Sequence, residues 1–82
     1  MTQSHHLIKV IADMALFLEF TDEHSLNPDA AVEMMEHIAA ELQLLKEDEK
    51  VRVIDSFAKI AKAYRGDESD FVKALPDTFG LR

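Results

Sequence analysis

The sequence contains no cysteine and only two glycines and two prolines. Without cysteine the chain has no disulfide, no thiolate zinc site and no cysteine nucleophile. Two glycines, Gly66 and Gly80, are too few for a loop that cradles phosphates. The longest unbroken apolar run, Met14 to Leu18, is far shorter than the roughly 20 residues of a membrane span. The N-terminus also lacks the pattern of a signal peptide, so we expect a cytoplasmic protein.

The length of 82 residues fits one domain, and an apolar content of 48% is enough to build a core. We find no strand pattern, no internal repeat and no linker-like stretch. The sequence therefore predicts a single helical domain over residues 1–82.

Acidic residues are concentrated in the middle of the chain, and the overall net charge is −7. From Asp13 to Glu49 there are eleven acids and one base, whereas from Lys50 to Arg82 seven bases outnumber five acids. This distribution argues against binding nucleic acid or an anionic membrane, because both require a cationic surface. It favours a basic protein partner, although net charge also keeps small domains in solution.

The stretch from Asn27 to Leu45 has the clearest helical pattern. Asn27 is a good N-cap, and Pro28 suits the first position of a helix. At about 100° per residue, the apolar residues of this stretch fall on one side: Ala31, Val32, Met34, Met35, Ile38, Ala39, Leu42 and Leu45. The opposite side carries Asp29, Glu33, Glu36, His37 and Glu41. This pattern predicts an amphipathic helix over residues 28–45 with an acidic outer face.

A first helix is predicted over residues 4–20, with an apolar face wide enough to contact two neighbours. Phe20 points away from that face, so it is either the last residue of this helix or a residue beyond it that folds back onto the core. The apolar stripe of the second helix would continue at Glu49 and Arg52, which are charged. A tight turn within residues 44–49 is therefore expected before a third helix over residues 49–65.

The C-terminal part is predicted to form a short fourth helix over residues 68–75. Asp67 would cap this helix, Pro76 would stop it, and Gly66 would end the helix before it. Phe79 and Leu81 in the tail would dock onto the bundle or onto a partner. The sequence therefore predicts an all-α fold: a small antiparallel three-helix bundle with a short fourth C-terminal helix.

The motifs of enzymes and of bound metals are missing. Glu33, His37 and Glu41 are spaced i, i+4, i+8, and histidine with carboxylate at i, i+4 can share a transition metal. However, neither H-E-x-x-H nor E-x-x-H occurs, and these three side chains are predicted to face solvent. We therefore expect no enzyme, no metal and no cofactor.

An acyl-carrier-like or small-molecule-binding helical domain is one alternative. The small size, the acidity and the Ser25–Leu26 pair ahead of an acidic helix are similar to acyl carrier proteins. That family carries phosphopantetheine on the serine of an aspartate-serine-leucine motif, whereas His24 stands here in place of the aspartate. A second pair, Asp55–Ser56, is predicted to lie inside the third helix.

The favoured hypothesis is a non-enzymatic interaction domain that binds a basic protein through its acidic surface. Nucleic-acid-degrading toxins need cationic clefts, which an acidic helix face would complement. In size and charge the chain resembles small acidic bundles that neutralise nuclease bacteriocins, which implies an immunity or antitoxin-like role. A structural homodimer is the remaining alternative. The predicted partner-binding residues are Asp22, Glu23, Asp29, Glu33, Glu36 and Glu41.

Overall fold

The computed structural model describes the backbone of residues 2–82 and the side chains from His5 onward. This part of the chain forms α1 (Thr2–Phe20), α2 (Pro28–Gln43), α3 (Glu47–Ile60), a 3₁₀ turn η1 (Ala61–Ala63) and α4 (Gly66–Thr78). The predicted all-α class is confirmed, since residues 2–82 form four α-helices and no strand. None of the described helices combines the length and the apolar character that crossing a membrane requires.

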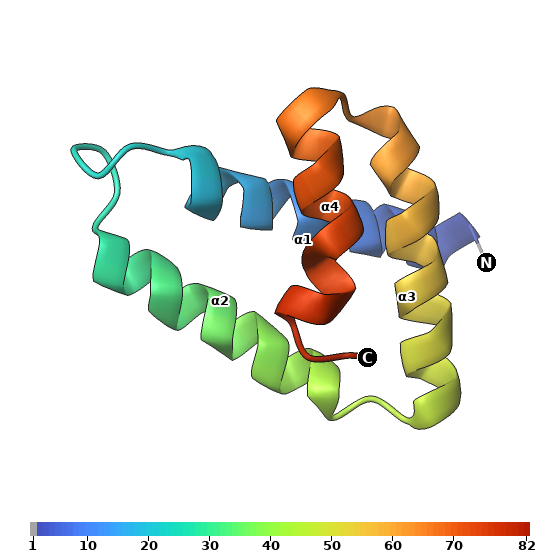
Figure 1. The fold of residues 1–82 in the computed structure, drawn as a ribbon. Coiled ribbons are helices and arrows are strands. Elements are labelled where there is room, and N and C mark those ends of the chain that lie inside the picture. Colours follow the sequence, from blue (N-terminus) through green and yellow to red (C-terminus); the bar gives the residue numbers. More distant parts are fainter. Residues whose placement is uncertain (1) are drawn as a thin grey trace.

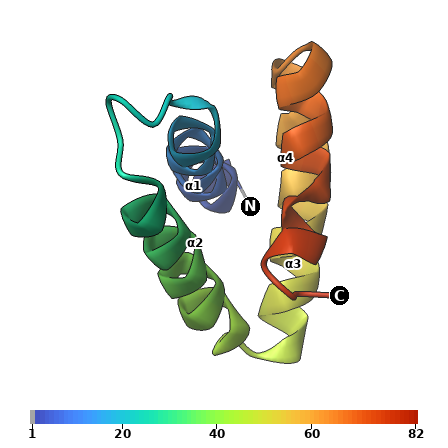
Figure 2. The same cartoon turned by 60° about the vertical axis from the view of Figure 1, so that its left-hand side comes forward.

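The helices are arranged in two pairs (Figures 1 and 2). α3 and α4 lie side by side and run in opposite directions, and α1 crosses behind them at a steep angle. α2 leaves the far end of α1, diverges from the other helices and returns to the start of α3 through residues 44–46. The predicted turn within residues 44–49 is therefore confirmed.

The core lies where α1, α3 and α4 meet. Its buried apolar side chains are Ile8, Ala12, Ala15, Phe57, Ala61, Val72, Leu75, Phe79 and Leu81. Three of these come from α1 at a spacing of four and three residues, which puts them on one side of that helix. Two of the three are alanines, whose small side chains let α1 approach α3 closely. The rings of Phe57 and Phe79 pack together with their centroids 6.2 Å apart.

α2 contributes little to this core. None of its sixteen residues is buried, and its inner side chains Met35, Ile38, Ala39 and Leu42 are half-buried against the core. The C-terminal end of α2 is attached to the tail because the Gln43 side-chain amide donates a hydrogen bond to the Phe79 carbonyl, with N and O 2.8 Å apart. α2 is therefore an amphipathic helix that is covered only in part.

The fourth helix is longer than predicted. It runs from Gly66 to Thr78, so Pro76 lies inside it and Asp67 lies in its first turn without acting as a cap. A proline in the last turn removes only one intrahelical hydrogen bond, and the Pro76 ring is fully buried, which offsets that loss. The Pro76 carbonyl then accepts a hydrogen bond from the Leu81 amide at 2.8 Å.

Other boundaries also differ from the prediction: α1 begins at Thr2 rather than at residue 4, α2 ends at Gln43 rather than at residue 45, and α3 begins at Glu47 rather than at residue 49. α3 ends at Ile60 and tightens into η1, whereas the sequence pattern continued to residue 65.

Phe20 is the last residue of α1, in agreement with the predicted range 4–20, and its half-exposed ring packs against Phe71 in a T-shaped arrangement with centroids 5.6 Å apart. Docking of the tail onto the bundle was one of two predicted alternatives. The structure shows this docking, because Phe79 and Leu81 are buried.

Candidate functional site

The loop between α1 and α2 is ordered by two short side chains. The Asp22 carboxylate accepts hydrogen bonds from the backbone amides of His24 at 3.1 Å and Ser25 at 2.9 Å. The Asn27 side-chain oxygen accepts from the amides of Asp29 at 2.8 Å and Ala30 at 3.3 Å, which makes Asn27 the predicted N-cap of α2. These hydrogen bonds fix the conformation of both ends of the loop, which holds the start of α2 beside the end of α1.

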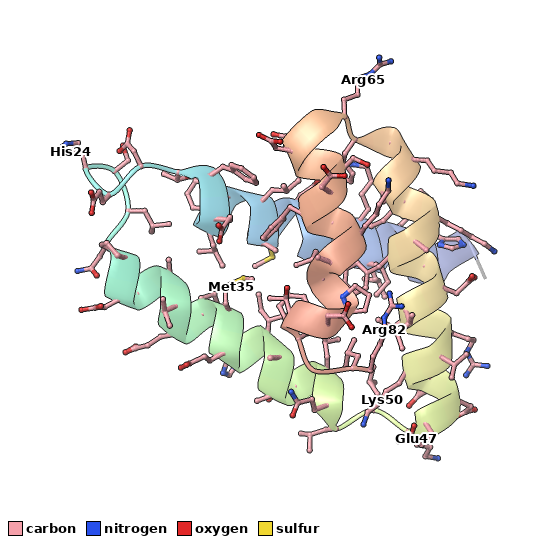
Figure 3. All side chains as sticks on the ribbon, viewed as in Figure 1. His24, Met35, Glu47, Lys50, Arg65 and Arg82 are labelled. Carbon is pink, nitrogen blue, oxygen red and sulfur yellow. The ribbon has the colours of Figure 1, made fainter. Side chains whose placement is uncertain are left out.

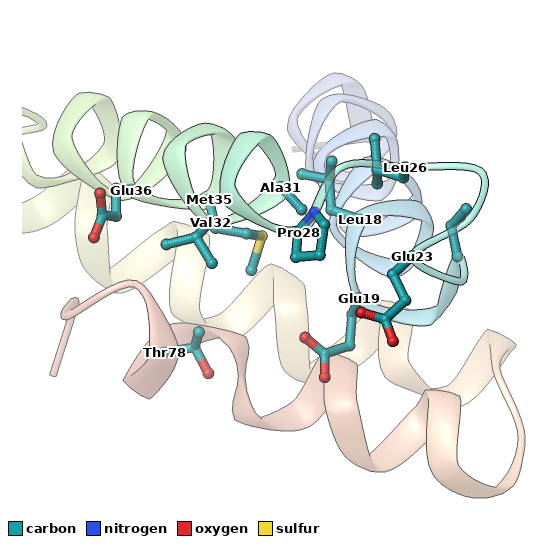
Figure 4. Close-up of a pocket in the computed structure, with 11 residues that line it drawn as sticks. Leu18, Glu19, Glu23, Leu26, Pro28, Ala31, Val32, Met35, Glu36 and Thr78 are labelled. Atoms are coloured by element: carbon teal, nitrogen blue, oxygen red, sulfur yellow. The ribbon is translucent and has the colours of Figure 1, made fainter.

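A cleft of about 510 Å³ lies where this loop, α1 and α2 face the C-terminal end of α4 (Figure 4). Its apolar lining consists of Leu18, Leu26, Pro28, Ala31, Val32 and Met35. Met35 points from α2 into the space between the helices (Figure 3), and Thr78 of α4 closes the opposite side. The cleft is therefore built by the continuous stretch from the end of α1 into α2 together with the distant end of α4.

Carboxylates form the polar part of the cleft. Glu19 and Glu23 lie at one end and Glu36 lies at the other, and all three are exposed. Among the described side chains that line the cleft, none is basic. The hydroxyl of Thr78 donates to the Ala74 carbonyl at 3.1 Å, so this hydroxyl is already engaged within α4. The arrangement suits a ligand that combines an apolar group with cations.

The six predicted partner-binding acids are all exposed, and two of them line the cleft. Glu23 and Glu36 line the cleft, whereas Asp22, Asp29, Glu33 and Glu41 are not part of its lining. On α2, Glu41 lies about 140° around the helix axis from Glu36. Of the predicted acidic face, Glu23 and Glu36 therefore border the cleft, and a role of all six acids in partner binding stays a prediction.

Sequence reasoning missed Glu19 and the apolar lining. Glu19 continues the row of Ile8, Ala12 and Ala15 along α1 at the same alternating spacing of four and three residues. Because the Glu19 carboxylate lies in line with these buried residues, it indicates that this side of α1 leaves the core at its C-terminal end and faces an opening. The apolar lining gave no such signal, because its residues belong to stripes that any packed helix shows.

The other sequence candidates lie elsewhere. Ser25 is exposed on the loop, whereas Ser56 is buried in α3 and has no room for a bulky arm. Glu33 and His37 are exposed on α2, as is Glu41. In the part of the chain that the structure describes, no group of three or more histidine and carboxylate side chains is placed to hold a metal ion.

A scan against protein-family models and searches of curated proteins and of solved structures find no match to this chain.

Proposed function

We propose that this chain is a non-enzymatic interaction domain that binds a basic protein, and that the cleft between α1, α2 and α4 receives that partner. The observation that carries the proposal is the composition of the cleft, an apolar floor between three exposed carboxylates with no basic side chain among the described lining residues. Burying an apolar side chain supplies affinity, and the carboxylates select a cationic neighbour.

The more concrete form of the proposal is an immunity or antitoxin-like protein that blocks a basic toxin. Enzymes that cut nucleic acids carry cationic clefts, and an acidic domain seated over such a cleft would exclude the substrate. The concentration of acids on the α1–α2 side speeds encounter with such a partner, since opposite charges steer association. Antiparallel packing of the first three helices and a cytoplasmic location remain predictions within this proposal.

A defined peptide tests the cleft without knowledge of the natural partner. The probe is a short peptide of alternating lysine and leucine, followed by NMR chemical shifts of the full chain during titration. We expect the largest shifts at Met35, Ala31 and Thr78, and weaker binding as salt is raised. A peptide with glutamate in place of lysine should not bind. Shifts that are spread over all helices, or an equal response to the acidic peptide, would contradict the proposal.

Matched charge reversals separate the cleft from the general acidity of the chain. Glu19→Lys with Glu36→Lys and the control pair Glu33→Lys with Glu41→Lys change the net charge by the same amount. The cleft pair should weaken binding of the basic peptide by about a hundredfold, and the control pair by less than about tenfold. Equal effects of the two pairs would show that only net charge matters.

A carrier role is the second candidate, favoured by the exposure of Ser25 on the loop directly ahead of α2. Intact mass of the chain isolated from its native host checks this role. A phosphopantetheine increment that disappears in Ser25→Ala would establish the carrier, and an unmodified chain would remove it.

A further inference from the structure

The cleft lies beside a helix that has only one close neighbour. Along its length α2 packs chiefly against α1, and it makes few contacts with α3 or α4. The side of α2 that faces α4 is therefore left open. Val32 and Met35 point from α2 toward this opening (Figure 4), and the Val32 side chain is 56% exposed although it lines the cleft. The structure thus leaves an elongated apolar space between two helices.

The α2 wall of the cleft follows one side of the helix over about two turns. Its lining residues are Pro28, Ala31, Val32, Met35 and Glu36. At 1.5 Å per residue, the distance along the axis from Pro28 to Glu36 is roughly 12 Å. Glu19 and Glu23 lie near the Pro28 end of this wall, and Glu36 lies at the other end (Figure 4). An occupant that meets the carboxylates at both ends therefore needs two cations roughly 12 Å apart, with an apolar surface between them.

The shape of the lining favours a helical occupant over an extended one. Extended segments bind by adding a strand to the edge of a sheet, and residues 2–82 form no strand. Polyproline segments dock onto aromatic side chains, and none of the described lining residues is aromatic. A helix satisfies its own backbone hydrogen bonds and can lay an apolar ridge into a groove between two other helices.

We propose that the basic partner inserts a single α-helix between α2 and α4, and that this helix carries two basic side chains seven residues apart with apolar residues between them. Positions i, i+3, i+4 and i+7 lie on one side of a helix and span roughly 10 Å, which flexible lysine or arginine side chains extend to the required distance. One cation then meets Glu19 and Glu23, and the other meets Glu36. This inference rests on the proposed function, because it specifies the segment that the same cleft receives.

Two isotope-labelled peptides of identical composition and about 14 residues test the helical form of the partner against the full chain. The helical peptide has lysine at i and i+7, leucine at i+3 and i+4, and alanine elsewhere. The second peptide has the same residues with lysine and leucine in alternating order. We expect the helical peptide to bind at least about tenfold more tightly. Its Cα chemical shifts should become helical in the complex, since a free peptide of this length is only partly helical.

A central proline in the helical peptide should weaken its binding by about a hundredfold, because proline breaks a helix. Equal binding of the two peptides, no effect of the proline, or an extended conformation in the complex would overturn the helical partner and leave the proposed function standing. If neither peptide binds, the proposed function fails together with this inference.

Double-mutant cycles test the spacing of the two cations. Each lysine of the helical peptide is changed to alanine and combined with Glu19→Ala or Glu36→Ala in the protein. We expect Glu19 to couple to one lysine and Glu36 to the other, whichever way the helix runs. For a coupled pair, the two changes together weaken binding by less than the product of their separate effects.

The control for these cycles is Glu33→Ala, which removes the same charge from α2 outside the lining of the cleft. It should couple to neither lysine. Circular dichroism verifies that each variant is folded. Coupling of Glu19 and Glu36 to the same lysine, or equal coupling of Glu33, would overturn the proposed spacing. Absence of coupling at both Glu19 and Glu36 would overturn it equally.

Discussion

α2 and the corner formed by α3, η1 and α4 are built from similar amphipathic patterns but end up in different environments. The corner contributes Phe57, Ala61, Val72 and Leu75 to the core, whereas α2 buries no residue fully. Among the described side chains, a hydrogen bond joins α1 to Tyr64, the residue after η1, through Asp13, and none joins α1 to α2. The difference shows that an amphipathic helix can be well formed and still bury little of its surface against the other helices.

The charges differ in the same way. On α3, Arg52 pairs with Asp48 at 3.5 Å and Lys59 pairs with Asp55 at 3.1 Å. α2 has four acids and no lysine or arginine, so its carboxylates have no cation on their own helix. The helix with the least internal packing therefore presents the least compensated charge, which agrees with a surface kept for an external partner.

Removing a large core side chain from the corner should have the largest effect on stability. We expect Phe57→Ala to lower the free energy of unfolding by about 3–5 kcal/mol, since the ring is completely buried and its loss leaves a cavity. Leu42→Ala on α2 should cost only about 1 kcal/mol, because that side chain is half-buried. Urea denaturation of both variants measures the comparison. Equal losses would show that α2 contributes as much to the fold as the corner.

The two glycines test how tightly α2 is held to the tail. Gly80 has φ +71°, and a Cβ there would lie 2.8 Å from the Gln43 side-chain nitrogen. Gly66 has φ +58° with open space around it. Gly80→Ala should therefore cost roughly 2–3 kcal/mol and Gly66→Ala about 1 kcal/mol. Thermal unfolding of both variants provides the check. If Gly66→Ala is the more harmful change, the contact with Gln43 is not restrictive.

Removing the hydrogen bond from Gln43 to Phe79 should loosen α2 alone. Gln43→Ala should cost about 1 kcal/mol, because the partly buried bond is lost. The amides of α2 should then exchange hydrogen faster while those of α3 and α4 remain protected. Leu44→Ala is the control, since Leu44 is largely exposed and makes no such bond. Faster exchange throughout the protein would mean that α2 and the corner unfold together.

The smallest expected effect concerns the pH dependence of the contact between α1 and Tyr64, which follows η1. Burial, and then the hydrogen bond to Asp13, raise the pKa of Tyr64 above its ordinary value of 10.0, and hydrogen bonds to Asp13 and Tyr64 raise the pKa of Lys9. Both shifts favour the protonated groups in the folded chain. Their contribution to stability is therefore complete below pH 10 and is lost as the pH rises through the higher folded values.

Absorbance at the phenolate band measures the Tyr64 titration directly, because Tyr64 is the only tyrosine and the chain has no tryptophan. The folded chain should titrate above pH 10.0 and the urea-unfolded chain near it. Asp13→Asn should lower the folded midpoint. A folded midpoint at or below that of the unfolded chain would contradict the contact.

Local signals made much of the helical layout predictable. Asn27 and Pro28 specify where α2 begins, and the change of phase at Glu49 and Arg52 requires the turn that the structure shows at residues 44–46. Pro76 misled the prediction, because a proline that stops most helices is tolerated in a last turn whose ring is buried.

The choice between the two apolar rows of α1 was not predictable from periodicity. Ala12 and Ala15 are buried while the larger Met14 and Phe17 are exposed, a result that depends on how closely α3 approaches α1. The cleft was unpredictable for a related reason. It joins Glu19, Glu36 and Thr78 from three helices, and a single sequence does not state how those helices are placed.

The order of the core along the chain has a consequence for biosynthesis. α1 is synthesised well before Val72, Leu75, Phe79 and Leu81, which complete the core around it. Until they leave the ribosome, α1 exposes its apolar residues on both sides. We expect the nascent chain to acquire its stable fold only after synthesis has passed residue 81, and to be a ligand for general chaperones before that point.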